Sequence, residues 1–125
     1  MSHFSKIKTK ISDKNCLIKT LLALGYCPEE GLAIRGYQGS LTRVDIQIKP
    51  DAHGYAIGFR KEGENYVCVA DWFGIRGIEQ EAFLQKLTQQ YAVEATKDRL
   101  LAQGFCLAEE KRVDGRIHLV LRRAA

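Results

Sequence analysis

The sequence predicts an α+β protein: a two-layer sandwich in which helices cover one face of a largely antiparallel sheet. Two observations support this fold class. Short segments with alternating apolar residues follow one another along the chain, and consecutive strands joined by short turns pair antiparallel. Two segments with apolar residues at helical spacing interrupt them, near residues 13–24 and 79–103. The expected order is one strand, a helix, four strands, a helix and two strands, within a single domain at 1–125.

The chain is expected to begin with a strand and a helix. Residues 5–11 read SKIKTKI, in which lysines alternate with isoleucine and threonine, the period of a half-buried strand. Ser12 or Asp13 can cap the helix that follows, because a short polar side chain there accepts a backbone N–H of the first turn. Gly25 stands where the helix should end, since glycine readily adopts the positive φ of a C-terminal cap. Pro28 prevents any continuation.

Four strands are expected next, each marked by alternating apolar residues. Two turn signals separate the later ones, PDAHG at 50–54 and KEGEN at 61–65, which contain the residues that tight turns favour. The second turn should close a hairpin. The four strands are expected at 31–37, 43–49, 55–61 and 66–72.

A second helix and a hairpin complete the predicted fold. The helical segment 79–103 carries two apolar stripes that are out of phase, so we expect a kink or a break near residues 91–95. Asp114 and Gly115 form a strong two-residue turn signal between two strands. The last strand should direct three residues into the core: Ile117, Leu119 and Leu121.

The composition indicates a soluble protein. Charged residues make up 27% of the chain and hydrophobic residues 46%. No apolar run approaches the length of about 20 residues that spans a bilayer, so no membrane insertion is expected. The N-terminus lacks the apolar core of a secretion signal. The net charge of +4 arises in the first half, where residues 1–50 hold eight basic and four acidic side chains.

The cysteines and histidines form no metal-binding or catalytic pattern. The four cysteines lie singly with no Cys-x-x-Cys, which favours buried thiols in a reducing compartment over disulfides. Cys68 lies in mid-strand among valines, a poor environment for a nucleophilic thiolate. The three histidines share no i, i+4 spacing with one another or with a cysteine. No metal, cofactor or catalytic residue is therefore predicted.

Basic residues form the first candidate binding surface. The alternation of strand 5–11 directs Lys6, Lys8 and Lys10 away from the helices, and Arg60 is expected on the same sheet face. A basic strand beside aromatic residues can hold RNA or single-stranded DNA. The pI of 8.9 and the lack of a known nucleic-acid-binding motif weaken this hypothesis. Lysines that keep a solvated or edge strand from aggregating are the commoner explanation.

Asp71 and Trp72, at the end of strand 66–72, form the second candidate site. A carboxyl group beside a large apolar ring can have a raised pKa, as in a catalytic acid, so an enzyme or small-ligand site is one interpretation. No second carboxylate or histidine is placed to complete a pair. In the favoured interpretation Asp71 caps the turn after the strand, while Trp72 and Phe73 pack against the helices.

Three stretches of the chain carry a resemblance to a known family: MSHFSKIKTKI with the helix that ends in LGY, the centre GYAIGFRKEGENYVCVADWFGI, and the closing DGRIHLVLRR. Along nearly its whole length the chain resembles the hypothetical chloroplast open reading frame thirty-five family of cyanobacteria and red-algal-type plastids, also catalogued as a domain of unknown function. The resemblance implies a setting in the plastid stroma or the cyanobacterial cytoplasm. It carries over no catalytic residues.

These observations favour a non-enzymatic protein that binds another macromolecule, as an assembly or regulatory factor with a protein partner. A one-sided basic sheet with aromatic residues is a reasonable protein-binding surface. Two alternatives stay open: nucleic-acid binding through the N-terminal lysines, and a small-ligand or enzyme site at Asp71 and Trp72.

Overall fold

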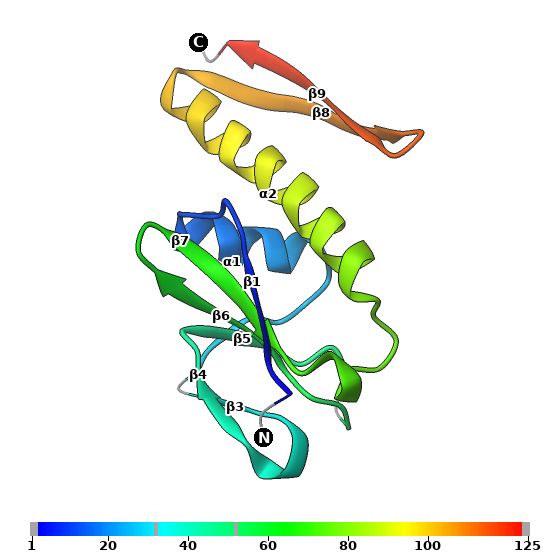
Figure 1. Cartoon of the computed structure of the whole chain (residues 1–125). Helices are drawn as coiled ribbons and strands as arrows, with labels where there is room; N and C mark the ends of the chain where they lie inside the picture. The colour runs from blue at the N-terminus through cyan, green and yellow to red at the C-terminus, as the bar shows by residue number, and fades with distance from the viewer. Residues whose placement is uncertain (1–2, 32, 52, 124–125) are drawn as a thin grey trace.

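The computed structural model describes residues 3–31, 33–51 and 53–123 of the chain (Figure 1). Met1 and Ser2, half of the Met-Ser-His-Phe start that contributes to the family resemblance, lie outside the described residues. The α+β class is confirmed, and every strand pair among the described residues is antiparallel.

A five-stranded sheet forms the centre of the molecule, and two helices cover one of its faces (Figure 1). The helices are α1 (Lys14–Ala23) and α2 (Gln80–Ala102). The strand at one edge is β1, so the predicted lysine strand is an edge strand. The order across the sheet is β1 (Ser5–Lys8), β7 (Asn65–Ala70), β6 (Ile57–Glu62), β5 (Ile46–Ile48) and β2 (Glu29–Glu30).

Helix α1 begins and ends as the sequence predicts. The Asp13 carboxylate accepts the backbone N–H of Cys16 at 2.8 Å, the contact of an N-cap. Gly25 follows the last turn with φ at 93°, a backbone conformation that glycine adopts without steric cost. Leu17 and Leu21 are fully buried between these ends. Their burial against the sheet holds the helix on the core.

The main hydrophobic core lies between the sheet and the helices. Strands β6 and β7 contribute fully buried residues from the centre of the sheet, and Phe83 and Leu87 of α2 close the core from above. The largest fully buried members of this core are Phe59, Leu17, Leu21, Ile46, Ile48, Ile57 and Leu87.

The opposite face of the sheet, on which the basic residues were expected, carries a second, smaller core. A ribbon of β3 (Ala33–Arg35) and β4 (Leu41–Arg43) covers it. Gly58 of β6 permits this close approach, because a Cβ there would lie 2.2 Å from Cγ1 of Val44. The buried residues of this second core are Ile34, Val44, Ala56, Val67 and Val69.

The strand predicted at 43–49 is divided between two sheets. Its first part pairs with β3, and its second part, β5, pairs with β6. The chain crosses over at Val44, which is buried in the second core, and Asp45, whose N–H bonds to the carbonyl of Phe59. With the two-residue strand β2, the described residues between the helices therefore form six short strands in place of the four expected.

Helix α2 is continuous through residues 91–95, where we expected a kink or a break. The first apolar stripe packs on the main core, whereas the second is only partly covered, with Leu101 57% exposed. Phe83 and Leu87 belong to the main core. Gln90 accepts a hydrogen bond from Arg112 at 2.7 Å, on the side of the C-terminal hairpin. A helix between two layers needs two contact faces, and no break is required.

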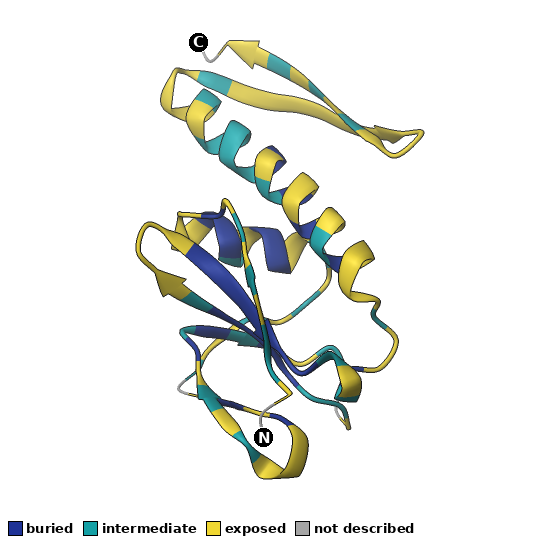
Figure 2. Ribbon diagram, in the orientation of Figure 1, coloured by how far each residue is buried: buried dark blue, intermediate teal, exposed yellow. Residues whose placement is uncertain are grey.

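The last two strands, β8 (Phe105–Val113) and β9 (Arg116–Arg123), form a separate two-stranded sheet on the far side of α2 (Figure 1). The predicted turn is confirmed, with φ at 51° for Asp114 and 75° for Gly115. No described residue of either strand is buried (Figure 2). The three residues expected in the core, Ile117, Leu119 and Leu121, are only half-buried.

Candidate binding surfaces

The predicted lysine surface lies along the edge strand β1. Lys6 and Lys8 are exposed in the strand, and Lys10 is exposed just beyond it. Lys6 forms an ion pair with Glu62, with Nζ 3.1 Å from Oε1. Among the described residues, Lys8 and Lys10 form no ion pair. The structure therefore separates the lysines into one that is paired and two that are free.

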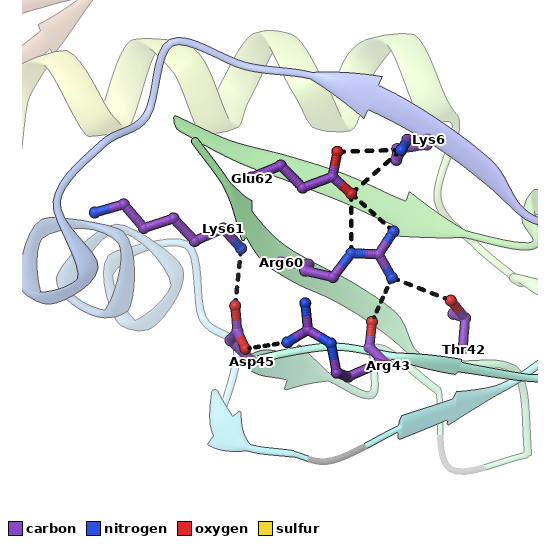
Figure 3. Close-up of polar contacts among 7 residues, drawn as sticks. All are labelled: Lys6, Thr42, Arg43, Asp45, Arg60, Lys61 and Glu62. Carbon is purple, nitrogen blue, oxygen red and sulfur yellow. Dashed lines mark hydrogen bonds and ion pairs between the residues drawn. The ribbon is translucent and has the colours of Figure 1, made fainter. Parts of the chain in front are cut away.

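Glu62 joins two of the predicted site residues, Lys6 and Arg60 (Figure 3). The Arg60 guanidinium lies 2.9 Å from Oε2 of Glu62 and donates to the carbonyl of Arg43 at 2.8 Å and to the hydroxyl of Thr42 at 3.3 Å. The hydrogen bonds from Lys6 and Arg60 hold the pKa of Glu62 below its usual range. Arg60 thus fastens the β3–β4 ribbon to β6, and little of its charge is left for a ligand.

A second carboxylate, Asp45, continues this polar network (Figure 3). It accepts from the Arg43 guanidinium at 3.0 Å and from the backbone N–H of Lys61 at 2.8 Å. The hollow beside it is also lined by Lys14 and Glu30, which form an ion pair with each other. Two of the basic residues that line this hollow are paired with its two acidic residues, but Lys61 forms no ion pair with a described residue, so the lining keeps a single excess positive charge.

Asp71 is almost completely buried, with 1% of its surface exposed, and it connects two short 3₁₀ turns. Its Oδ1 accepts the backbone N–H of Phe73 at 3.2 Å, and its Oδ2 accepts that of Tyr37 at 2.9 Å. The capping contact with Phe73 is the one that the favoured interpretation of Asp71 requires. Its second contact, with a residue 34 positions earlier, could not be inferred from local sequence.

Trp72 packs in a different direction from Asp71. Its ring is half-buried against the main core, with its centroid 6.1 Å from that of Phe83 in α2. Its Nε1 is buried and has no hydrogen-bond partner among the described residues. The acid contacts the turn at Tyr37, and the indole contacts a helix. The Asp71 side chain therefore stabilises the turns, and the Trp72 side chain packs on the main core.

Phe73 is exposed, whereas we expected it to pack against the helices. In the short turn 72–74 the chain directs Trp72 inward, and 85% of the Phe73 surface is left in contact with solvent. Tyr37, on the other turn held by Asp71, is 36% exposed, and Leu41 at the start of β4 is 67% exposed. We call Tyr37 and Phe73, whose backbone amides the Asp71 carboxylate holds together, the aromatic surface.

Sequence reasoning missed the aromatic surface. Phe73 follows Trp72 directly, and two consecutive large rings at the end of a strand cannot both reach the same core, because successive side chains point in different directions. That rule could have indicated one exposed ring. The position of Tyr37 beside the turn at Phe73 depends on a long-range hydrogen bond from its backbone N–H to Asp71, which local sequence does not reveal.

The buried thiols are poor nucleophiles. Burial raises the pKa of Cys68 to about 12. Burial, together with the hydrogen bond that Cys16 donates to Asp98, raises the pKa of Cys16 to about 12. Both groups are thiols at neutral pH, and thiolates are the reactive form. Within the described ranges, no three His, Cys, Asp or Glu side chains are grouped so that they could hold a metal ion.

Helix length and hydropathy give one further result. Neither of the two α-helices in the described part of the chain is both long and apolar enough to cross a membrane.

Comparisons with known proteins place these features in a family. A family model described as "Protein of unknown function (DUF1257)" matches residues 20–120. Two relatives named "Uncharacterized protein ycf35", from Cyanophora paradoxa and Guillardia theta, are each 37% identical to the chain, and a third from Pyropia yezoensis is 36% identical. Each alignment covers 98% of both sequences. No solved structure matches the chain. These similarities are consistent with a plastid or cyanobacterial origin.

Proposed function

The chain belongs to the DUF1257 family, in agreement with the resemblance described above, and we propose that it acts by binding a protein partner through the aromatic surface. It would serve as a non-enzymatic assembly or regulatory factor in the plastid stroma or the cyanobacterial cytoplasm. The observation that carries the proposal is the exposure of Phe73, a large apolar ring with 85% of its surface in contact with solvent.

The backbone beneath the aromatic surface is held rigid, which favours binding. Asp71 fixes the amides of Tyr37 and Phe73 with one buried carboxylate. Gly36 allows Phe4 to pack tightly beneath, because a Cβ at this position would lie 2.8 Å from the Phe4 ring. An aromatic side chain on a fixed backbone loses little further entropy on binding, and such residues dominate the energy of many interfaces.

Charge indicates the chemistry of the partner. Arg35 precedes the turn at Tyr37, and Arg76 follows the turn at Phe73. Both are exposed, and neither forms an ion pair with any described residue. An acidic segment that carries apolar side chains fits this combination of rings and unpaired guanidinium groups.

The test compares Phe73→Ser with the wild-type protein and with Leu22→Ser, a matched control on α1 that also removes an exposed apolar side chain. Proteins captured from plastid or cyanobacterial extracts by all three would be identified, and the candidate partner purified and titrated calorimetrically. We expect Phe73→Ser to weaken binding at least about 30-fold, the effect of losing an anchor worth about 2 kcal/mol. Leu22→Ser should bind like wild type.

A partner that binds Phe73→Ser as tightly as wild type would overturn the proposal. The contribution of Arg35 and Arg76 predicts that affinity falls as salt is added. An affinity for an acidic partner that does not change with salt would remove the charge argument.

The two alternatives are less well supported. For nucleic acid, only two of the three N-terminal lysines, Lys8 and Lys10, form no ion pair with a described residue, since Lys6 binds Glu62. Titration with oligothymidylate at two salt concentrations tests this alternative, because phosphate binding requires affinity that falls steeply with salt. A small-ligand site at Asp71 and Trp72 is less well supported because the Asp71 carboxylate already accepts two backbone hydrogen bonds.

A further inference from the structure

The C-terminal hairpin combines the longest strands of the described chain with the least burial. Strands β8 and β9 contain nine and eight residues, and none is buried. Apolar side chains remain exposed on both strands, at Leu107, Val113 and Val120. A two-stranded sheet of this kind is marginally stable in water unless something else covers or extends it. Helix α2 covers one face only (Figure 1).

The backbone of β8 leaves pairing groups free along its outer edge. Val113 and Arg116 flank a two-residue turn, so they form a hydrogen-bonded pair of the ladder. Because hydrogen-bonded and non-hydrogen-bonded pairs alternate, Arg112 and Glu110 direct their N–H and C=O groups away from β9. No described strand pairs with that edge. Strand β8 can therefore accept another antiparallel strand there.

The charges of β8 are complementary to those of a second copy of β8 that runs antiparallel to it. Two acids are followed by two bases, Glu109, Glu110, Lys111 and Arg112. When two copies of β8 pair antiparallel around Lys111, Glu110 of each copy lies opposite Arg112 of the other. Both of these residues lie on the α2-facing side, where Glu110 bonds to Lys97 at 2.6 Å and Arg112 to Gln90 at 2.7 Å. Opposite charges across a strand pair stabilise it.

Other pairings are less favourable. A register centred on Glu110 would place two carboxylates opposite each other. In the register centred on Lys111, the like-charged pair is Lys111 with its copy, which stays hydrated on the outer face, where each bonds to its own Glu109 at 3.1 Å. Strand β9 offers no such match, because its formally charged residues are all arginines.

We propose that two copies of this chain associate through β8, antiparallel and around a two-fold axis at Lys111. The product is a four-stranded sheet in the order β9, β8, β8, β9. Both α2 helices then lie on the same face of that sheet, because a two-fold axis perpendicular to a sheet preserves its faces. The half-buried row of Ile117, Leu119 and Leu121 becomes part of a larger covered layer. The aromatic surface takes no part, so the proposal is independent of the function proposed above.

The first test measures mass in solution by sedimentation over a roughly thousandfold range of concentration. We expect the mass to rise from the 14.1 kDa of one chain to twice that value. A folded protein that remains at the mass of one chain throughout the range would overturn the proposal.

Charge reversal tests the register. Glu110→Arg and Arg112→Glu should each weaken the dimer by at least about tenfold, since each places like charges opposite each other. The double variant Glu110→Arg/Arg112→Glu should restore wild-type association. It does not restore the contacts with Lys97 and Gln90 within one chain, so rescue reports on the pairing between copies. Failure of the double variant to regain affinity would contradict this register.

A proline variant tests the edge itself. Glu110→Pro removes an N–H that the ladder within one chain does not use, and proline is tolerated at such an edge position. It should stay folded, as judged by circular dichroism, and sediment as one chain. Glu110→Gln keeps the N–H and is the matched control, which should still dimerise. A proline variant that dimerises like Glu110→Gln would exclude β8 as the interface.

Discussion

The hairpins β6–β7 and β8–β9 are built alike, yet they lie in opposite environments. Each consists of two antiparallel strands joined by a tight turn that contains a glycine with positive φ, Gly63 in one and Gly115 in the other. In β7 every residue after Asn65 is buried, and in β8 none is. The β6–β7 hairpin is flanked by β5 and β1 in the sheet, and it is covered by the helices on one face and by the β3–β4 ribbon on the other. Coverage by the rest of the chain decides burial, and hairpin formation does not.

Thiol labelling should give the largest contrast between the two hairpins. Cys68 in β7 is fully buried, and Cys106 in β8 is exposed. We expect Cys106 to react with a thiol reagent at neutral pH about a thousandfold faster or more, because Cys68 requires global opening that costs at least ~5 kcal/mol. Mass spectrometry of the labelled peptides measures both rates. In denaturant the two should react alike, and similar rates in the native protein would contradict the assigned burial.

Side-chain truncation should sharpen the same contrast in stability. Phe59→Ala in β6 removes a fully buried ring and should lower the free energy of unfolding by about 3–5 kcal/mol. Leu121→Ala in β9 removes a half-buried side chain and should cost less than about 2 kcal/mol. Urea unfolding of both variants provides the comparison. Equal losses would show that the hairpin is buried more deeply than described.

Removal of carboxylates should give a smaller difference. Asp71→Ala leaves the amides of Tyr37 and Phe73 without their acceptor and should cost about 1–3 kcal/mol. Glu109→Ala in β8 loses only an exposed ion pair with Lys111 and should change stability by less than about 1 kcal/mol. Chemical denaturation at low protein concentration, where association through β8 is minimal, measures both. An Asp71→Ala protein as stable as wild type would mean that Asp71 does not hold the two turns.

The pH dependence from Glu62 should be the smallest effect. Its pKa is lowered in the folded protein by Lys6 and Arg60. The stabilisation is therefore fully present above the ordinary value of 4.5 and is lost as pH falls through the lowered pKa. The stability difference between wild type and Glu62→Gln should shrink as pH falls below 4.5. A difference that stays constant over that range would mean that the ion pairs contribute nothing.

The parts of the fold that local chemistry determines were predictable. Asp13 caps α1, Asp114 and Gly115 form the last turn, and the alternating segments become strands. The crossover at Val44 was not predictable, because the choice between two sheets depends on Gly58, a distant residue that leaves room for it. The two stripes of α2 were read as a break, since periodicity reports the faces of a helix and not the layers that meet them.

The candidate surfaces were predictable only in part. Alternation identified the exposed lysines of β1, but the partner of Lys6, Glu62, lies 56 residues away and had no local signal. The contact of Asp71 with the turn at Phe73 follows from local capping chemistry. The exposure of Phe73 depends on which of two adjacent rings fits beside Phe83, and that is decided by packing.

The position of Trp72 has a spectroscopic consequence. It is the only tryptophan in the chain, and its indole N–H is buried beside the main core with no acceptor among the described residues. An indole in an apolar environment emits at shorter wavelength than one in water, so the fluorescence of this protein reports on the sheet and its helices. The distant β8–β9 hairpin could detach from α2 without changing that signal. Unfolding followed by tryptophan fluorescence alone would therefore record a two-state transition even if the hairpin detached first and the sheet unfolded in a second step.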